Sequence, residues 1–389
     1  MAKRLAGRLG LLFSSSLLTI VLLEIAARCC CRPPPIVEIT MLSGTTERLA
    51  EENRSPLVGS AQRTPLEIGL FVPTPNGRRL RASSRVTIEN SSTSGLTTQV
   101  ITNSLGFRNR EIGKKTRPRV LFLGDSITMA EYLPDEQCFV RLVESRSEQR
   151  AQPLETINAG VSGISLATEL SILVESGIAL EPDVVVVGFF LNDVADSPGV
   201  RILAVPRWLR RSWLCQYVYR ALSMVRGRTD QDRELCKEDA ARWFAKARKM
   251  YPQASGDPLV DRNAFYGFVL KHFYSWGHVW VDDPWRRLQP MFGELKRLSI
   301  LHHFTPLVVC FPVRVQVEAQ FVEDYPQRQL RRICAEHGLL LLDLLPTLRQ
   351  AYQTSSEPLF YDDCHHTARG NDVIADRILP FILEQLRTW

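Results

Sequence analysis

A serine, a histidine and an aspartate are placed in this sequence where they could perform nucleophilic catalysis. Ser126 ends a Gly-Asp-Ser triplet after an apolar run, and Asp362 and His365 lie three residues apart near the C-terminus. A serine hydroxyl is a poor nucleophile unless a base takes its proton. An imidazole can be that base if a carboxylate on its other nitrogen fixes the tautomer. We therefore predict a relay with Ser126 as nucleophile, His365 as base and Asp362 as the group that orients the base.

A second aspartate–histidine pair makes the choice of base ambiguous. Asp363 and His366 have the same spacing, and one helical or 3₁₀ turn would place either pair on one face. The two pairs together could also form a metal site, but adjacent histidines point in different directions and Ser126 would then have no role. A nucleophilic thiol at Cys364 is disfavoured, because neighbours in a turn cannot align as nucleophile and base. We expect neither a metal nor a cofactor.

Three donors could stabilise the oxyanion that forms when a serine attacks an ester. They are the backbone N–H of Ser126, the backbone N–H of Gly163 and the side-chain amide of Asn192. Glycine lets the backbone approach a ligand closely, and an asparagine amide offers N–H donors without charge. Each residue alone could belong to an ordinary turn or cap. Each of the three residues follows the end of a different predicted strand, and this shared position favours an oxyanion hole.

Five short apolar runs, which alternate with helical patterns, must position these residues. The runs are 120–123, 154–158, 184–191, 307–311 and 339–343, with later helices at about 285–303, 323–337 and 370–387. Apolar runs bounded by turn residues are typical of parallel strands covered on both faces. The alternation predicts a three-layer α/β/α sandwich around a mostly parallel five-stranded sheet. Chemistry in such sheets gathers beyond the carboxyl ends of the strands, where the candidate residues fall.

The four segments together resemble the SGNH (GDSL-type) hydrolase superfamily over residues 118–389. Gly-Asp-Ser126 matches the first motif, the stretch ending at Gly163 the second, Asn192-Asp193 the third and Asp362-x-x-His365 the last. The resemblance implies an SGNH/flavodoxin-like fold, an acyl-enzyme mechanism and the catalytic and oxyanion roles given above. In that superfamily the spacing from the histidine to the glycine that opens the last helix favours His365, because Gly370 lies five residues further on.

Two positions depart from the superfamily pattern. Ile127 replaces the leucine of the GDSL motif, which is a conservative change. Phe190 stands where the third motif usually has glycine, so we expect a narrower pocket or a shifted loop beside Asn192. Thr128 lies two residues after the serine, where the nucleophile elbow of α/β-hydrolases requires glycine, so that motif does not fit.

The N-terminal segment 1–31 is predicted to be a membrane anchor. Lys3, Arg4 and Arg8 precede the stretch 9–27, whose nineteen residues are mostly apolar and uncharged except for one glutamate near its end. This length suits a spanning helix, and no clear cleavage site follows, so an uncleaved anchor is favoured over a signal peptide. Basic residues before the span place the N-terminus in the cytoplasm. The remainder of the chain is expected in the periplasm or otherwise on the extracytoplasmic side.

Two further segments flank or interrupt the alternating pattern. Residues 32–117 begin with a Pro-rich stalk and contain strand-like runs at 69–72, 85–88 and 97–102. We expect them to form a small β-rich extension that packs on the main domain. Residues 199–283 are a helical insertion rich in Arg and Trp. The insertion could be a lid that shapes specificity or meets the membrane, and a plain structural insert is the other interpretation.

The composition argues against some classes of partner. The chain of 389 residues has a net charge of +6, of which residues 1–32 supply +4 through five basic residues and one acidic residue. The excess of positive charge is therefore concentrated near the N-terminus and does not indicate nucleic-acid binding. Nine cysteines in a chain of this length do not indicate a disulfide framework. Cys29, Cys30 and Cys31 are contiguous, which is not a metal-ligand spacing, and are either incidental thiols or acylation sites.

These features predict a membrane-anchored serine hydrolase that cleaves or transfers an acyl or acetyl ester. The anchor, the extension and the Asn-x-x-Gly-Phe-Arg stretch at 103–108 resemble the membrane-anchored SGNH proteins of bacterial cell envelopes, which implies an acylated envelope polysaccharide as substrate. A lipase or a thioesterase is a lesser variant. A non-catalytic envelope scaffold would be indicated by a missing member of the relay, and none is missing. The oligomeric state is left open.

Overall fold

A computed structural model describes the regular core of the chain and leaves out several connecting segments. The described residues are 19–30, 37–41, 69–91, 93–194, 200–204, 212–218, 264–265, 277–280, 283–319 and 323–386. The chain divides into two compact units, Met1–Glu38 with Ile202–Glu234, and Ile39–Arg201 with Leu235–Trp389. The first half of the predicted anchor and most of the predicted 199–283 insertion lie outside the described residues.

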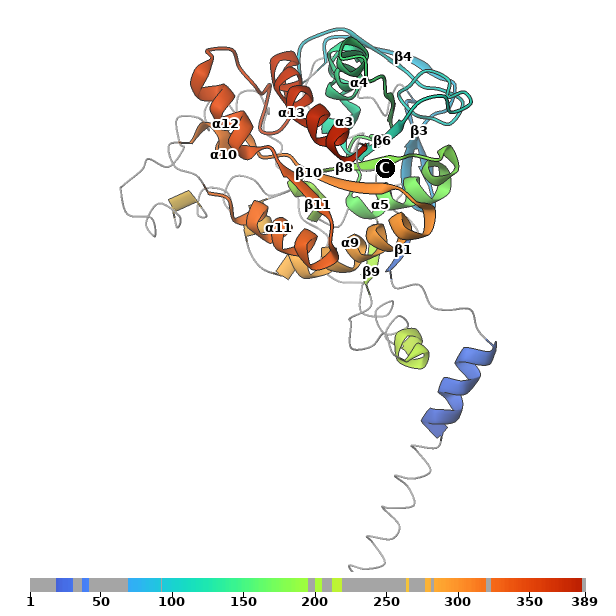
Figure 1. Cartoon of the computed structure of the whole chain (residues 1–389). Helices are drawn as coiled ribbons and strands as arrows, with labels where there is room; N and C mark the ends of the chain where they lie inside the picture. The colour runs from blue at the N-terminus through green and yellow to red at the C-terminus, as the bar shows by residue number, and fades with distance from the viewer. Residues whose placement is uncertain are drawn as a thin grey trace, which may run out of the picture. The chain divides into compact units, whose positions relative to one another are not determined.

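The larger unit is built on a five-stranded sheet in which all neighbouring strands are parallel (Figure 1). Its strands are β6 (Arg119–Gly124), β7 (Glu155–Asn158), β8 (Val184–Phe189), β10 (Thr305–Cys310) and β11 (Leu340–Asp343). Every residue of β6 and β8 is buried, as expected for central strands covered on both faces. The predicted parallel five-stranded sheet is therefore confirmed.

The strand order places the candidate serine at a topological switch point. The order across the sheet is β7-β6-β8-β10-β11, so the chain leaves β6 towards one edge and later returns to build the other side. In such sheets the loops after the two strands at the switch point diverge and leave a crevice at their carboxyl ends. Ser126 directly follows β6, and Asn192 follows β8.

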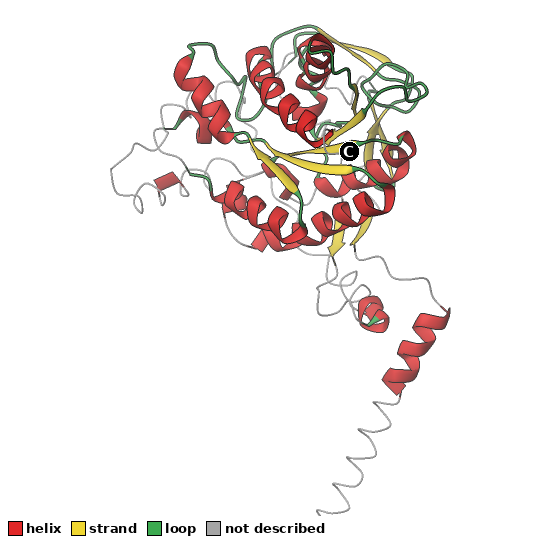
Figure 2. Ribbon diagram, in the orientation of Figure 1, coloured by secondary structure: helices red, strands yellow, loops and turns green. Residues whose placement is uncertain are grey.

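Helices cover both faces of the sheet and complete the predicted α/β/α sandwich (Figure 2). One face carries α4 (Phe139–Gln149), α12 (Leu345–Thr354) and α13 (Ala368–Leu386), and the other carries α5 (Leu166–Ile172), α9 (Asp283–His302) and α11 (Tyr325–His337). The helices predicted near 285–303, 323–337 and 370–387 correspond to α9, α11 and α13. The sequence analysis missed α12, in which Pro346 occupies the first turn, a position that needs no backbone N–H donor.

Short elements connect the layers. They are α3 (Ser126–Met129), η1 (Asp135–Gln137), η2 (Leu173–Gly177), η3 (Ile178–Leu180), η4 (Leu191–Val194), η7 (Gly277–Trp280) and α10 (Arg314–Glu318). Separate from the main sheet, β1 (Val37–Met41) pairs with β9 (Val200–Ala204). The core beside the sheet contains an aromatic cluster in which the ring of Phe139 lies 5.8 Å from that of Phe122 and 5.6 Å from that of Phe311.

The β-rich extension belongs to the same compact unit as the sheet. It consists of two antiparallel pairs, β2 (Phe71–Thr74) with β3 (Gly77–Leu80), and β4 (Arg85–Ile88) with β5 (Thr98–Ile101). The sequence analysis predicted strands near β2, β4 and β5 but missed β3. The guanidinium of Arg79 in β3 donates to Ser171 Oγ at 2.7 Å and pairs with Glu175 at 2.8 Å, which holds this hairpin to α5 and η2.

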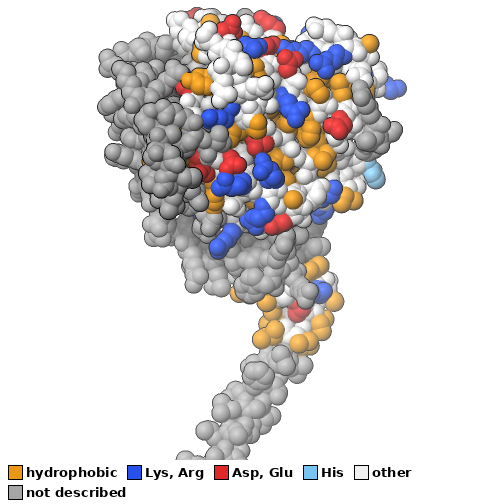
Figure 3. Space-filling view, turned by 60° about the vertical axis from the view of Figure 1, so that its left-hand side comes forward, with side chains coloured by type: hydrophobic (Ala, Val, Ile, Leu, Met, Phe, Trp, Pro, Cys, Tyr) orange, Lys and Arg blue, Asp and Glu red, His pale blue; other side chains and the backbone are white. Residues whose placement is uncertain are grey.

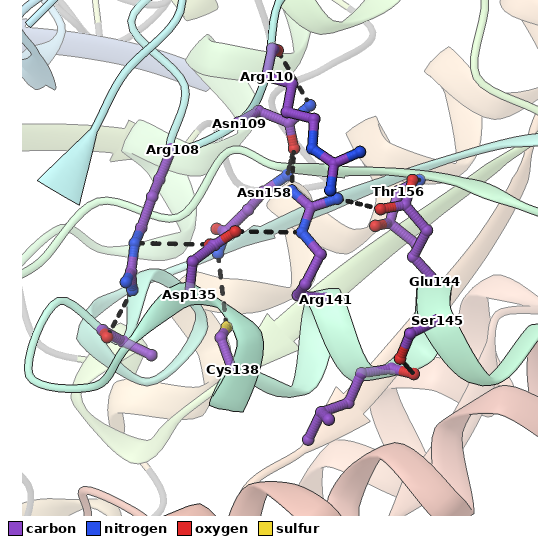
Figure 4. A network of polar contacts seen from close by, with 12 residues as sticks. Arg108, Asn109, Arg110, Asp135, Cys138, Arg141, Glu144, Ser145, Thr156 and Asn158 are labelled. Carbon is purple, nitrogen blue, oxygen red and sulfur yellow. Dashed lines mark hydrogen bonds and ion pairs between the residues drawn. The ribbon is translucent and has the colours of Figure 1, made fainter. Parts of the chain in front are cut away.

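A buried arginine fastens the loop that follows the candidate serine (Figure 4). Arg108 is 1% exposed and donates to the backbone carbonyls of Met129, Ala130 and Leu133 at 2.5–2.7 Å. Its Nε lies 3.7 Å from Asp135. The carbonyls of Met129 and Leu133 thereby obtain a partner inside the protein, and that of Ala130 gains a second donor besides the N–H of Leu133. The Gly-Phe-Arg stretch of the extension therefore serves as a clamp on the segment 129–135.

In the smaller unit, the described residues form a helix over 19–30 and a short helix over 213–218. The first helix carries exposed apolar side chains, including Ile20, Leu22 and Ile25 (Figure 3). Glu24 of this helix accepts hydrogen bonds from the backbone N–H groups of Trp213 and Leu214 at 3.0 and 2.9 Å. Among the described residues, no helix combines the length and apolarity needed to cross a membrane. The anchor at 1–31 stays a prediction.

Candidate active site

The fold brings Ser126, His365 and Asp362 together although 239 positions separate the serine from the histidine. Ser126 Oγ lies 2.9 Å from His365 Nε2, and His365 Nδ1 lies 2.6 Å from Asp362 Oδ2. Both separations are hydrogen-bond distances. The three side chains therefore lie in the order hydroxyl, imidazole and carboxylate that a proton relay requires.

Ser126 is held at the first position of α3, immediately after β6. The Asp125 carboxylate caps this short helix by accepting the N–H of Ile127 at 2.9 Å. Gly124 ends the strand, and a side chain there would collide with Thr128 Oγ1, 2.1 Å from the Cβ position. Glycine therefore permits the tight turn that brings the serine hydroxyl to the edge of the sheet.

Asp362 and His365 are joined by a non-helical turn, which corrects the predicted helical or 3₁₀ geometry. Residues 361–364 form a bend. One carboxylate oxygen of Asp362 accepts the backbone N–H groups of Cys364 at 3.0 Å and His365 at 2.7 Å. These bonds from an aspartate to the backbone two and three residues ahead replace the helical ones. The second oxygen is left for the imidazole, so the same carboxylate fixes both the turn and the ring.

The structure places only one of the two adjacent histidines beside the serine. The ring of His366 is buried and lies 4.6 Å from Phe360 and 5.9 Å from Phe311, centroid to centroid. Neither of its ring nitrogens has a hydrogen-bond partner in the described part of the chain. His365, and not His366, is therefore the histidine that contacts Ser126.

The charges of the relay are strongly coupled. Burial lowers the pKa of His365, but the Asp362 charge and its hydrogen bond outweigh burial and raise that pKa to about 9. Burial likewise opposes ionisation of Asp362, yet the imidazolium charge and hydrogen bonds bring the pKa of its carboxyl below the ordinary value. The site thus stabilises imidazolium, the form that a general base reaches after taking the serine proton.

Tyr132 packs against the imidazole of His365 and was not identified from the sequence. Its ring lies 4.9 Å from that of His365 at an interplanar angle of 66°, an edge-to-face arrangement. The side chain is 2% exposed, and burial raises the pKa of its phenol. Tyr132 belongs to the segment 129–135 that Arg108 holds. Arg108 therefore also helps to fix the position of the ring that packs against His365.

The three predicted oxyanion donors lie at the carboxyl ends of β6, β7 and β8. In the described chain the N–H groups of Ser126 and Gly163 have no hydrogen-bond acceptor, so both are available to a ligand. Gly163 has φ +69°, a left-handed conformation that suits glycine. Asn192 donates one amide hydrogen to Asp125 Oδ2 at 2.9 Å, which leaves its second hydrogen free for an oxyanion. Asp125, next to the nucleophile, thus also orients Asn192.

The loop that carries Asn192 rests on buried carboxyl groups. Asp193 accepts the N–H of Phe190 at 2.8 Å. Burial and neighbouring negative charges raise the pKa of both Asp193 and Glu169 well above their ordinary values. Phe190, at the position where the superfamily pattern has glycine, is itself buried. Its side chain therefore contributes to the core at the end of β8.

Asp362, Cys364 and His365 are the group among the described residues whose donor atoms could also hold a metal ion, all within 4.8 Å. Metal binding would need a thiolate, whereas burial raises the pKa of Cys364 well above its ordinary value. It would also need donor atoms of His365 and Asp362 that are already bonded to each other. The donor set therefore fits a proton relay better than a metal site.

Comparisons with known proteins gave matches only among solved structures. No family model matches the chain, and no curated protein matches its sequence. Structures similar to it include LAE5, an α/β hydrolase enzyme from the metagenome of Lake Arreo, Spain, with 16% identity, a TM-score of 0.39 and coverage of 68% of this chain and 94% of that one.

Two further matches are similarly distant. The acetyl xylan esterase AlAXEase shares 14% identity, with a TM-score of 0.36 and coverage of 68% of this chain and 99% of that one. A member of the lipolytic protein G-D-S-L family from Veillonella parvula shares 14%, with a TM-score of 0.34 and coverage of 67% and 96%. At such TM-scores the likeness is too slight to assign a function, which must rest on the geometry of the site.

Proposed function

We propose that this chain is a serine hydrolase of the SGNH type that acts on an ester through an acyl-enzyme. The observation that carries the proposal is the continuous contact from Ser126 Oγ through His365 to Asp362. Free N–H groups at Ser126 and Gly163 and the tethered amide of Asn192 support it, because they supply donors for a developing oxyanion.

The relay accounts for both halves of the reaction. Ser126 Oγ attacks the ester carbonyl while its proton passes to His365 Nε2, and the carbonyl oxygen becomes an oxyanion held by the N–H donors. The C–O bond to the alcohol then breaks, and the alcohol leaves with the proton from Nε2. A water molecule next gives a proton to Nε2 and attacks the acyl carbon. The carboxylic acid departs as the proton returns to Ser126 Oγ.

The acceptor in the second half decides between two activities. Water as acceptor makes the protein an esterase or deacetylase, whereas a sugar hydroxyl makes it an O-acyltransferase. We propose an acyl or acetyl ester on a cell-envelope carbohydrate as substrate. The predicted N-terminal anchor, which would hold the catalytic unit on the extracytoplasmic side of the membrane, supports this choice. A lipase, which cleaves a lipid ester, or a thioesterase, which cleaves a thioester, would use the same relay.

The proposal is tested by measuring ester cleavage with purified full-length chain. We expect release of 4-nitrophenol from 4-nitrophenyl acetate and of acetate from acetylated glycans, and Ser126→Ala should lower kcat at least about 10³-fold. Ser145→Ala is a matched control, because Ser145 lies on α4 and bonds only to a carbonyl of its own helix. Equal rates for wild type and Ser126→Ala would overturn the assignment. Transfer of acetyl to added sugar would identify a transferase.

A further inference from the structure

An arginine from the β-rich extension lies against the candidate oxyanion hole. Arg78 belongs to β3, and its Nη2 lies 1.8 Å from the position that a Cβ of Gly163 would occupy. Any side chain at position 163 would therefore collide with the guanidinium. Arg78 and Gly163 are 85 positions apart in the sequence (163 − 78), so this contact exists only because the extension packs on the sheet.

The guanidinium of Arg78 is positioned but has no polar partner. Its carbon lies 4.8 Å from the ring centre of Phe71, on which the cation is held. Within the described residues it forms neither a hydrogen bond nor an ion pair, and its nitrogen atoms are not fully buried. A guanidinium with five N–H donors in a fixed fork is suited to planar anions. An unpartnered one beside a candidate catalytic site is therefore available to a ligand.

Glu131 is the carboxylate whose charge acts on Arg78, and no ion pair joins the two among the described residues. Glu131 accepts the hydroxyl proton of Ser162 at 2.6 Å with one oxygen, and its other oxygen is buried without a hydrogen-bond partner among the described residues. Burial lowers the pKa of Arg78, while the Glu131 charge opposes that shift. Glu131 thus helps to keep the guanidinium charged without occupying its donors.

We infer that Arg78 is a specificity residue that binds a carboxylate on the alcohol part of the substrate, next to the scissile ester. The inference rests on the proposed ester hydrolysis and narrows its substrate class to acylated acidic carbohydrates. An acetyl group carries no charge of its own, so an anion recognised beside the oxyanion hole belongs to the alcohol. The extension then supplies substrate recognition, and the sheet supplies the chemistry.

The test compares two chromogenic esters that differ by one carboxylate in the leaving group, 4-nitrophenyl acetate and 3-carboxy-4-nitrophenyl acetate. We expect Arg78→Met to lower kcat/KM for the carboxylated ester about 10- to 100-fold more than for the neutral ester, mainly through KM. Arg78→Lys, which keeps the charge but loses the fork, should show a smaller selective loss. The same comparison should hold for acetylated polygalacturonate against acetylated xylan.

Arg85→Met is the matched control, because Arg85 lies in the same extension but is exposed and bonds to Gln99. It removes an equal charge and should leave the ratio of the two kcat/KM values unchanged. An equal loss on both esters with Arg78→Met, or no loss on either, would overturn the inference while the ester hydrolysis stands. Failure of the wild type to cleave either ester would overturn the proposed function and the inference with it.

Discussion

At the scale of single residues, the geometry and the charge of the site depend on the interactions of the Asp362 carboxylate. One of its oxygens organises the turn that carries His365, and the other bonds to the ring. Its charge also opposes the effect of burial on the imidazole. Position, tautomer and basicity of the proposed base therefore depend on one side chain.

The pH dependence of activity follows from the pKa of His365. A general base must be neutral to accept a proton, and this imidazole has a pKa of about 9 in the free protein. We expect kcat/KM for a neutral ester to rise with pH and to level off above about 9. A profile that levels off below pH 7 would contradict this account of the site.

Substitution of the orienting carboxylate should change both rate and pH profile. Without the charge of Asp362, burial dominates and the pKa of His365 falls, so the rise in kcat/KM moves to lower pH. We expect Asp362→Asn to lower kcat about 10⁴-fold at pH 8, because the wrong tautomer is favoured. The measurement is the pH–rate profile of the variant beside that of the wild type. A reduced rate with an unmoved profile would show that Asp362 only supports the turn.

At the scale of elements, the site is assembled where strands end, and this much follows from the sequence. The buried runs, the Gly-Asp-Ser turn and the alternation with helices predict the sheet and place Ser126, Gly163 and Asn192 at its carboxyl edge. The structure joins Ser126 to His365 and Asn192 to Asp125, the neighbour of Ser126, by hydrogen bonds. Motif spacing alone left two histidines open, because only packing shows that His366 faces Phe360 and not the serine.

Other residues of the site could not be predicted because no local pattern marks them. Arg78 lies in a strand that the sequence analysis missed, and its place beside Gly163 depends on how the extension packs. Tyr132 follows the serine by six positions and contacts His365 only through tertiary structure. Asp125 was visible as part of the motif, but its bond to Asn192 joins two different loops.

The Arg108 clamp provides a test at this scale. Arg108→Met would leave the carbonyls of Met129 and Leu133 without a donor, and we expect a loss of roughly 2–4 kcal/mol in unfolding free energy. Because the segment includes Tyr132, kcat should fall as well. Denaturant unfolding and ester hydrolysis would be measured on the same preparations. Stability unchanged from wild type would show that the clamp contributes nothing to the fold.

At the scale of the whole molecule, two parts of the larger unit share the proposed function. The sheet provides the relay and the oxyanion donors, and the extension provides Arg108 beneath the site and Arg78 beside it. A chain shortened to the sheet region would therefore keep the triad sequence but lose residues that support it. The full chain is the appropriate material for each measurement.

The acid stability of the molecule should depend on His366. Burial, together with the charge of His365, lowers the pKa of this imidazole to about 3. Its ordinary value is 6.5, so between pH 6.5 and 3 the unfolded chain binds a proton that the folded chain does not. Stability from this group is complete above pH 6.5 and is lost as pH falls, by about 1.4 kcal/mol per pH unit.

A substitution isolates this contribution. His366→Phe keeps an aromatic ring beside Phe311 and Phe360 and removes the titrating imidazole. When the pH is lowered from 7 to 4.5, the unfolding free energy of the wild type should decrease by about 2–3 kcal/mol more than that of the variant. The exposed His302 serves as control in the variant His302→Gln. An acid loss in His366→Phe as large as in the wild type would assign the effect to other groups.

The central claim is that Ser126 is a nucleophile activated by His365, and covalent labelling tests it most directly. The full chain would be treated with a fluorophosphonate, and the adduct located by peptide mass spectrometry. We predict a single modified residue, Ser126, and no labelling of the Ser126→Ala variant. Labelling should be at least about 10³-fold slower in His365→Ala than in the wild type, and it should be unchanged in His366→Ala. Equal labelling of the Ser126→Ala chain, or an adduct on another serine, would contradict the account.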